Sequence, residues 1–319
     1  MSASSESAVH AAELVKRFGE VEALRGVNLQ VERGELFGLV GPDGAGKTTF
    51  LRILACLMTP TSGRALVGGI DTMIDAAGVK RQIGYMSQRF SLSGTLTVLE
   101  NLLYVAEVWG VQPGTRRARI KRLLEFSRLG PFQDRLTRNL SGGMKQKLAL
   151  AACLIHQPKI LLLDEPTIGV DPLSRRDFWL ILYDLLQEGS TIVLSTPYMD
   201  EAERCTRVGF LLGGEVIACG PPSQLKTEIG VVVLHLHCAR PRESEKRLRA
   251  IPEFAHTSLF GERIHVTVPR RGFDVNAAIA RARQAGVSIE DWKLREPSLE
   301  DVFLAHTRAA SDAARRPAA

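Results

Sequence analysis

Nine consecutive residues, GPDGAGKTT at Gly41–Thr49, combine glycines, a lysine and hydroxyls in a pattern suited to phosphate binding. They stand between the strand-like run LFGLV and a helical segment that opens at Lys47. Glycines let the backbone curl so that several N–H groups face one phosphate, and the helix N-terminus adds positive charge. We predict that Lys47 reaches the β and γ phosphates of a nucleotide and that the Thr48 hydroxyl holds Mg²⁺.

A purely structural glycine turn is the alternative, and the lysine, the hydroxyl and the flanking elements argue against it. The residues assigned to nucleotide binding in this loop are Gly41, Pro42, Asp43, Gly44, Ala45, Gly46, Lys47, Thr48 and Thr49.

Two carboxylates end a second apolar run, KILLLDEP. In an open parallel sheet, ligands bind at the carboxyl ends of the strands, where Asp164 and Glu165 stand. Asp164 is predicted to be the second Mg²⁺ partner. Glu165 is placed to polarise the water that attacks the γ-phosphate. On this stretch alone, Glu165 could equally be a surface glutamate in a salt bridge.

These segments belong to a longer alternation of strand-like and helical runs from about Ala12 to Cys219, which predicts a mainly parallel sheet covered by helices. The turn signal GPPSQL then introduces a different order, β-α-β-β-α-β plus one helix, typical of a small ferredoxin-like α+β domain. We predict a flexible N-terminus over residues 1–10, a first domain over 11–222, an accessory domain over 223–308 and a disordered tail over 309–319.

Composition narrows the class of protein. The 319 residues are 45% apolar, enough for roughly two domains with buried cores. No apolar run approaches the ~18 residues that cross a bilayer, and the start lacks a secretion signal, so we expect a soluble, intracellular protein. The five scattered cysteines form no CxxC pair, which argues against a zinc site or a disulfide framework. The net charge of +6 is spread widely, so no nucleic-acid partner is expected.

The stretch LSGGMKQKLALA, Leu140–Ala151, taken with the phosphate loop and LLLDEPTIGVDP, resembles the nucleotide-binding subunit of an ABC transporter. The resemblance covers about two thirds of the chain. It implies a P-loop NTPase fold with a helical signature subdomain, ATP and Mg²⁺ as cofactors, and ATPase activity. Ser141, Gly142 and Gly143 would sit at a helix start, which is an anion-binding end, and would close on the ATP of a second ATP-binding subunit.

Other positions match the family one by one. Phe18 matches the aromatic residue that stacks on adenine, although a core aromatic is the alternative. Gln88 matches the glutamine that contacts Mg²⁺ and the attacking water, and it opens the segment that senses the membrane subunit. Asp171 matches the loop that passes signals across the dimer. Asp43 replaces the commoner asparagine, with little expected effect because the cradle is made of backbone N–H groups.

A larger departure from the family than Asp43 lies after the strand-like run at residues 191–194. The usual STHxMDEAE, whose histidine contacts the γ-phosphate, reads STPYMDEAE here, with Pro197 in the histidine's place. No histidine lies between His156 and His235 to replace it. The loss of such a donor costs about 10²-fold to 10³-fold in rate, so we hypothesise weakened hydrolysis at this chain's own site.

Two alternatives stay open for this segment. Thr196, Ser195 or Tyr198 could supply a substitute donor. Thr196 could also simply cap the next helix, with Pro197 in its first turn. The signature stretch, Leu140–Ala151, is intact, whereas the chain's own ATP site is expected to be weakened. This combination would favour pairing with a different ATP-binding subunit. A homodimer and a heterodimer both stay possible.

The C-terminal REPSLEDVFLAHT resembles the end of the extra domain in drug-exporter and ABC-2-type export subunits. The resemblance implies an ATPase subunit that works with integral membrane permease subunits on the cytoplasmic face of the inner (plasma) membrane and exports a drug-like or lipid-like substrate. The alternatives are a ribosome- or DNA-associated ABC protein, and a nucleotide-binding regulatory subunit with little hydrolysis. The single motif set, without a coiled-coil insertion, argues against the former.

Overall fold

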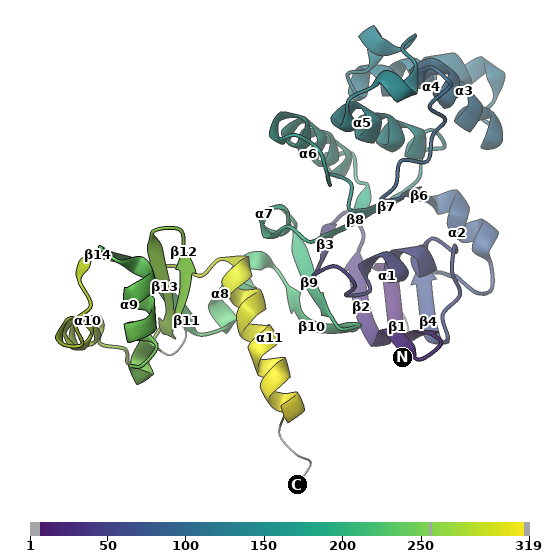
Figure 1. Ribbon diagram of the computed structural model, residues 1–319. Helices are drawn as coiled ribbons and strands as arrows, with labels where there is room; N and C mark the ends of the chain where they lie inside the picture. Colours follow the sequence, from purple (N-terminus) through teal and green to yellow (C-terminus); the bar gives the residue numbers. More distant parts are fainter. Residues whose placement is uncertain (1–6, 255–256, 316–319) are drawn as a thin grey trace. The chain divides into compact units, whose positions relative to one another are not determined.

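The computed structural model describes residues 7–254 and 257–315. The chain divides into two compact units, Met1–Cys219 and Gly220–Ala319. Figure 1 shows the elements of both units in sequence colours. Among the described residues, every helix is too short or too polar to cross a membrane.

The described part of the first unit contains a six-stranded sheet in the order β10-β9-β3-β8-β7-β6. Strands β6, β7, β8, β3 and β9 pair in parallel. Every residue of β3, β7 and β8 is buried, which explains their continuous apolar runs. The predicted parallel sheet is therefore confirmed. Its strands are β3 (Leu36–Val40), β6 (Ile83–Met86), β7 (Ile160–Asp164), β8 (Thr191–Thr196), β9 (Arg207–Leu212) and β10 (Glu215–Gly220).

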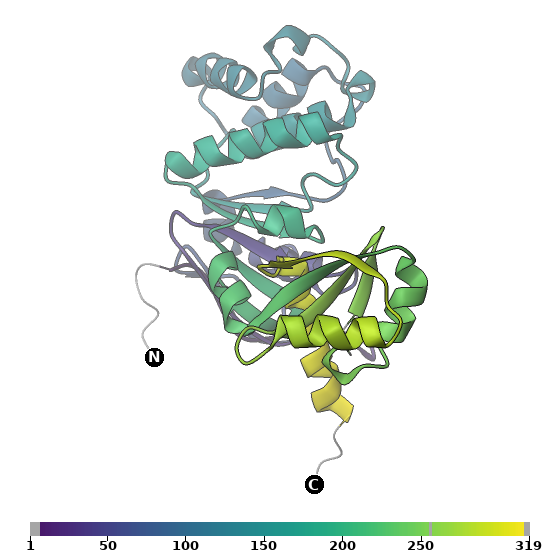
Figure 2. The same ribbon diagram turned by 90° about the vertical axis from the view of Figure 1, so that its left-hand side faces the viewer.

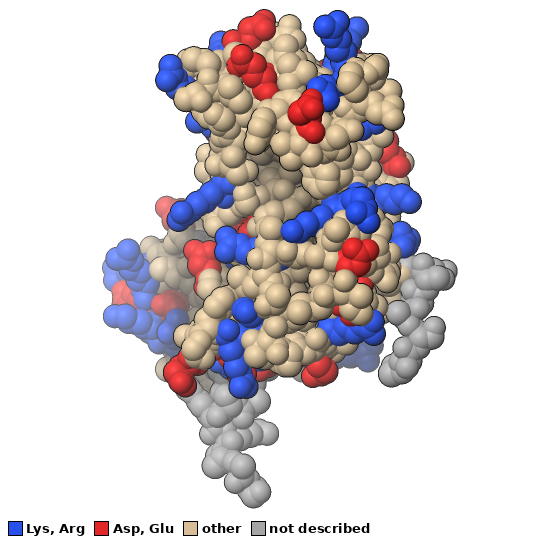
Figure 3. All heavy atoms as spheres, turned by 90° about the vertical axis from the view of Figure 1, so that its right-hand side faces the viewer, with Lys and Arg blue, Asp and Glu red and all other residues tan. Residues whose placement is uncertain are grey.

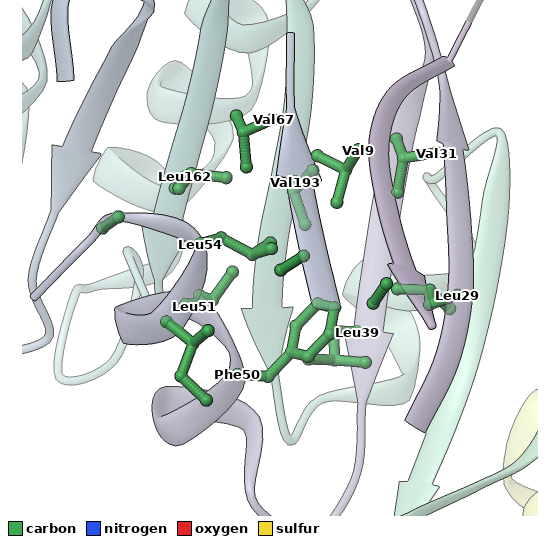
Figure 4. Close-up of a cluster of buried hydrophobic side chains, with 14 of the residues drawn as sticks. Val9, Leu29, Val31, Leu39, Phe50, Leu51, Leu54, Val67, Leu162 and Val193 are labelled. Carbon is green, nitrogen blue, oxygen red and sulfur yellow. The ribbon is translucent and has the colours of Figure 1, made fainter. Parts of the chain in front are cut away.

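A second sheet of this unit, absent from the sequence prediction, is antiparallel and has the order β2-β1-β4-β5 in the described residues. One core joins the two sheets: Figure 4 shows Val9, Val31 and Val67 of the antiparallel sheet near Leu162 and Val193 of the parallel one. Phe50, Leu51 and Leu54 of α1 complete this core. The strands are β1 (Ser7–Phe18), β2 (Val21–Glu32), β4 (Ser62–Val67) and β5 (Ile70–Asp71).

The helices of the first unit include a subdomain of α3, α4 and α5, at the top of Figure 1. It is the helical subdomain expected from the sequence. A capping box starts α3: Thr97 accepts the N–H of Glu100, and the Glu100 carboxylate accepts the N–H of Thr97. The helices are α1 (Lys47–Leu54), α2 (Ala76–Gln82), α3 (Val98–Val108), α4 (Pro113–Phe126), α5 (Gly142–Cys153), α6 (Pro172–Gln187) and α7 (Met199–Ala202), with 3-10 turns at Gly130–Phe132 and Thr137–Asn139.

The second unit confirms the predicted β-α-β-β-α-β order, with sheet order β12-β13-β11-β14 and antiparallel neighbours among the described residues. Helices α9 and α10 cover one face of this sheet (Figure 1 and Figure 2), because Leu248, Ala278 and Ile279 share a core with Leu234 and Val266. The elements are α8 (Pro222–Glu228), β11 (Val231–Cys238), α9 (Pro241–Leu248), the 3-10 turn Pro252–Phe254, β12 (Thr257–Phe260), β13 (Arg263–Pro269), α10 (Val275–Gln284), β14 (Ile289–Arg295) and α11 (Leu299–Arg315).

Two terminal predictions need correction. The flexible N-terminus predicted over 1–10 is wrong for residues 7–10, because β1 begins at Ser7 and pairs with both β2 and β4. The disordered tail predicted over 309–319 is wrong for residues 309–315, which continue α11. Alanine, the strongest helix former, dominates that stretch. Residues 1–6 and 316–319 lie outside the described part of the chain.

Candidate nucleotide site

The loop Gly41–Thr49 joins β3 to α1, as predicted. Its backbone needs glycine at two points. Gly46, the N-cap of α1, has φ 108°, a conformation that L side chains rarely adopt. A Cβ on Gly41 would lie 2.1 Å from the carbonyl oxygen of Leu211, so the loop approaches β9 too closely for any side chain there. The glycines thus fix a tight strand-to-helix turn, with the helix N-terminus facing the loop.

Lys47 lies inside this loop. Its Nζ donates hydrogen bonds to the carbonyl oxygens of Gly41 (2.7 Å) and Pro42 (3.0 Å). The same Nζ lies 3.2 Å from Oε1 of Glu165, with the two side chains only 3% and 4% exposed. A buried ion pair therefore joins the phosphate loop to the carboxylate at the end of β7.

Asp164 is fully buried at the end of β7. Its Oδ1 accepts hydrogen bonds from Thr48 Oγ1 (3.0 Å) and Ser195 Oγ (2.8 Å). The Tyr85 phenol lies 3.5 Å from Oδ2, and burial first, then the Asp164 charge, raises the pKa of Tyr85. The hydroxyl and carboxylate oxygens of Thr48 and Asp164 form a hard, anionic donor set, which fits Mg²⁺.

Glu165 has a left-handed backbone, φ 48°. Its Oε2 accepts a hydrogen bond from Gln88 Nε2 at 2.8 Å, and its N–H donates to Ser195 Oγ at 3.0 Å. The structure therefore brings Glu165, Gln88 and Lys47 together. With Thr48 and Asp164, they form one cluster at the carboxyl ends of the strands.

The remaining predicted residues lie on other elements. Ser141 is the N-cap of α5, and its Oγ accepts the N–H of Met144 at 3.2 Å. Gly142 and Gly143 begin that helix, and a Cβ on Gly143 would lie 2.3 Å from the Ser174 side chain. Helix α5 packs on α6, α3 and β6. The signature residues thus form a second helix N-terminus on the helical subdomain.

Asp171 and Phe18 occupy surface positions. Asp171 caps α6 by accepting the N–H of Ser174 at 2.9 Å, and this hydrogen bond lowers the pKa of Asp171. Phe18 ends β1 with its side chain 48% exposed, and Lys16 Nζ lies 5.1 Å from its ring centre. The alternative of a core aromatic is therefore wrong for Phe18.

The alternative in which Thr196 caps the next helix, with Pro197 in its first turn, is wrong. Helix α7 begins at Met199 after Tyr198, so Pro197 lies outside it. Thr196 Oγ1 accepts the N–H of Tyr198 at 3.0 Å and donates to Glu201 Oε2 at 2.7 Å. The buried Glu201 anchors the turn instead.

Comparison with known proteins agrees with this geometry. The ABC transporter family model matches residues 24–168, and the model of the ATP-binding protein DrrA1-3-like C-terminal domain matches residues 220–307. The daunorubicin/doxorubicin resistance ATP-binding protein DrrA of Streptomyces peucetius is 36% identical over 314 residues, covering 96% of this chain and 94% of its own. The chain belongs to the ABC transporter ATP-binding proteins. The predicted family and fold class are confirmed.

Other ABC proteins are similar in part or whole. The chain is 45% identical over 223 residues to the probable multidrug ABC transporter ATP-binding protein YbhF of Escherichia coli (70% of this chain), but spans only 39% of that protein's length. It is 37% identical over 291 residues to the Nod factor export ATP-binding protein I of Burkholderia lata, covering 91% of this chain and 93% of that one. The dimeric ATP-binding cassette MJ0796 bound to ADP and Pi superposes with a TM-score of 0.61 at 31% identity, covering 67% and 98% of the two chains.

The sequence did not point to Tyr85, which contacts Asp164, or to Glu201, which holds Thr196. Ser195 was named only as a substitute phosphate donor, and its contact with Asp164 was missed. The signal for Ser195 was present, since a hydroxyl pair interrupts a buried apolar strand. Its hydrogen-bond partner, Asp164, could not be predicted, because contacts between strands depend on sheet order and register.

Proposed function

We propose that this chain is the ATPase subunit of an ABC exporter, coupling Mg-ATP binding and hydrolysis to transport by separate membrane permease subunits. The observation that carries the proposal is the convergence of Lys47, Thr48, Asp164, Glu165 and Gln88 at the carboxyl ends of β3, β7 and β6. Backbone N–H groups of Gly41–Thr49 and the Lys47 ammonium bind the nucleotide phosphates. Phe18, exposed at the end of β1, is accessible for stacking on adenine.

The residues of this cluster have different roles in ATP hydrolysis. Glu165, whose carboxylate accepts from Gln88, orients and polarises the attacking water as general base. Nucleotide binding draws Lys47 from its ion pair towards phosphate, which leaves the Glu165 carboxylate free to act on water. Thr48 and Asp164 hold Mg²⁺, which neutralises phosphate charge when bound.

A second ATP-binding subunit completes each site. Supporting this, the start of α5 presents Ser141 and backbone N–H groups as an anion-binding helix end. Asp171 caps α6 beside it. The proposal is that each signature closes on the γ-phosphate held by the partner's loop.

Helix α3 and the segment after β6 support a permease contact. On α3, Val98, Leu102 and Ala106 are buried, whereas Tyr104 and Val108 are 62% and 66% exposed. Residues 84–87 and 89–92 border a hollow of about 170 Å³ with residues of α3 and α5, and Gln88 stands in the chain between these two stretches. A permease segment seated there would contact the chain neighbours of Gln88, whose side chain bonds Glu165. The chain would then work at the cytoplasmic face of the inner (plasma) membrane.

For the substrate, we propose an apolar, drug-like or lipid-like molecule moved outwards. The support is similarity over most of the chain to a daunorubicin/doxorubicin resistance protein and to a Nod factor export protein. The match of residues 220–307 to the DrrA1-3-like C-terminal domain adds to it. A nucleic-acid partner is not favoured: on the face in Figure 3, Lys and Arg are dispersed and mixed with Asp and Glu.

Weakened hydrolysis at this chain's own site remains part of the proposal. Two of the three candidate substitutes for the missing histidine are already engaged, because Ser195 bonds Asp164 and Thr196 bonds Glu201. The Tyr198 ring lies 4.7 Å from the Arg175 guanidinium. With its intact signature, the chain would also be able to complete the ATP site of a second, more active subunit.

Light scattering tests the site and its signature together. Glu165→Gln, which slows hydrolysis, is mixed with Mg-ATP and should form a dimer that ADP does not support. Adding Gly142→Asp should abolish the dimer by placing negative charge against the γ-phosphate. The side chain has room in the monomer, since a Cβ there meets nothing closer than 3.4 Å. Gly114→Asp, in open space at the start of α4, is the control and should leave dimerisation intact. Equal dimerisation of all three variants would contradict the proposed role of the signature.

A further inference from the structure

Ser195 lies between the two acidic residues of the site without belonging to the phosphate loop or the signature. It faces Asp164 in the parallel register of β8 and β7, and its side chain is fully buried. Its Oγ donates to Asp164 Oδ1 at 2.8 Å and accepts the N–H of Glu165 at 3.0 Å. One hydroxyl therefore joins the side chain of one acidic residue to the backbone of the next.

This contact fixes the orientation of the Asp164 carboxylate. Oδ1 accepts from Ser195 on the strand side and from Thr48 Oγ1 (3.0 Å) on the side of the phosphate loop. A carboxylate held by two hydroxyl donors on one oxygen loses its freedom to rotate. The Ser195 hydroxyl thereby sets the direction in which Asp164 presents its remaining lone pairs.

The same hydroxyl fixes the backbone that carries Glu165. This residue has φ 48°, a left-handed conformation that is uncommon for a non-glycine residue. Its N–H is shared between Ser195 Oγ at 3.0 Å and the Ser195 carbonyl oxygen at 3.2 Å. Without the hydroxyl, only the longer of these two bonds would hold the turn. The direction of the Glu165 side chain follows from that turn.

We propose that Ser195 is a positioning residue for ATP hydrolysis, which uses one buried hydroxyl to align the Asp164 carboxylate and the Glu165 backbone. The inference deepens the proposed ATPase function and rests on it. Residues that orient metal ligands typically matter by about 10-fold to 100-fold in metal affinity or activity. Ser195 acts on both acidic residues, so both Mg²⁺ dependence and turnover should respond to its loss.

The test compares variants that differ only in the hydroxyl. Ser195→Thr keeps the hydroxyl, whereas Ser195→Val has almost the shape of the threonine variant but no hydroxyl. Ser195→Ala removes the hydroxyl without adding volume, so it remains informative if valine impairs folding. For each, kcat and KM for ATP are measured, together with the Mg²⁺ concentration that half-saturates binding of a fluorescent ATP analogue. Nucleotide affinity in EDTA and the melting temperature control for loop integrity and folding.

Ser195→Val and Ser195→Ala should lower kcat by about 10-fold to 100-fold and raise the half-saturating Mg²⁺ concentration several-fold. The KM for ATP and the affinity in EDTA should stay within about twofold, because the phosphate loop is untouched. Ser195→Thr should stay within about threefold of the natural chain in kcat.

Equal kcat and equal Mg²⁺ dependence for the threonine and valine variants would overturn the inference. A different result would refute the proposed ATPase function: the natural chain would hydrolyse ATP no faster than Glu165→Gln. In that event the Mg²⁺ dependence of nucleotide binding, which needs no turnover, still decides the role of Ser195.

Discussion

The ammonium of Lys47 lies 3.2 Å from the Glu165 carboxylate, and both side chains are almost completely buried. One side chain comes from the phosphate loop and the other from the end of β7. Removing one partner of a buried pair leaves an uncompensated charge, whereas removing both does not. The pair therefore couples the stability of the fold to the residues proposed for catalysis.

We expect Lys47→Met to lower the free energy of unfolding by about 3 kcal/mol, because the buried Glu165 carboxylate loses its cationic partner. The double variant Lys47→Met/Glu165→Gln should recover most of that loss. Denaturant unfolding of the natural chain, both single variants and the double variant measures the coupling. If the double variant is as unstable as Lys47→Met, the ion pair does not carry this energy.

Restoring the missing imidazole should accelerate hydrolysis. Pro197→His is expected to raise kcat by about 10²-fold, the lower end of what one phosphate contact contributes. Pro197→Ala is the control, since it removes the ring without adding a donor. Steady-state Mg-ATP turnover measures both. Equal rates for the histidine variant and the natural chain would show that another group already makes the phosphate contact.

The close approach of the phosphate loop to β9 predicts a stability difference between two glycine substitutions. Gly41→Ala places a Cβ 2.1 Å from the Leu211 carbonyl oxygen, and such overpacking costs about 1–3 kcal/mol. Gly114→Ala, in open space in the first turn of α4, should be neutral or gain up to about 1 kcal/mol. Thermal unfolding compares the two. A stable, nucleotide-binding Gly41→Ala variant would contradict the loop geometry.

His156 predicts part of the pH dependence of stability. Its ring stacks on Trp109 at 3.8 Å, and its Nε2 lies 2.8 Å from the Ile83 carbonyl oxygen, to which it donates. Burial is the main cause that lowers the pKa of His156, and the Arg119 charge acts in the same direction. The folded state therefore resists protonation more than the unfolded state does. Stability is fully present above the ordinary histidine pKa of 6.5 and is lost as the pH falls below it.

The matching variant is His156→Phe, which keeps an aromatic ring on Trp109 but cannot be protonated. Its melting temperature should fall less between pH 7.5 and pH 5.5 than that of the natural chain. Parallel declines in the two proteins would show that His156 does not titrate in this range with the fold.

Local sequence patterns predicted much of the fold and of the candidate site. The phosphate loop, the DEP strand end and the signature each occupy a few adjacent residues, so their types and spacing identify them. The order of elements in the second unit was predictable because each strand and helix has its own periodicity.

Features that depend on distant contacts were not predictable. The long strands β1 and β2 contain register shifts, which break the alternation that marks a strand, and so the antiparallel sheet was missed. The start of α7 was misplaced because Glu201, five residues beyond Thr196, competes for the threonine hydroxyl. The role of Ser195 required knowing that β8 lies beside β7.

The most direct test of the proposed ATPase site is Mg-ATP turnover by the natural chain beside Glu165→Gln, with nucleotide affinity measured in parallel. Glu262→Gln, in an exposed turn of the second unit, is the control. We expect slow but measurable hydrolysis in the natural and control proteins, and a loss of about 10²-fold or more in Glu165→Gln with ATP affinity retained. Hydrolysis by Glu165→Gln at the rate of the natural chain would contradict the assignment of Glu165, and with it the proposed ATPase site.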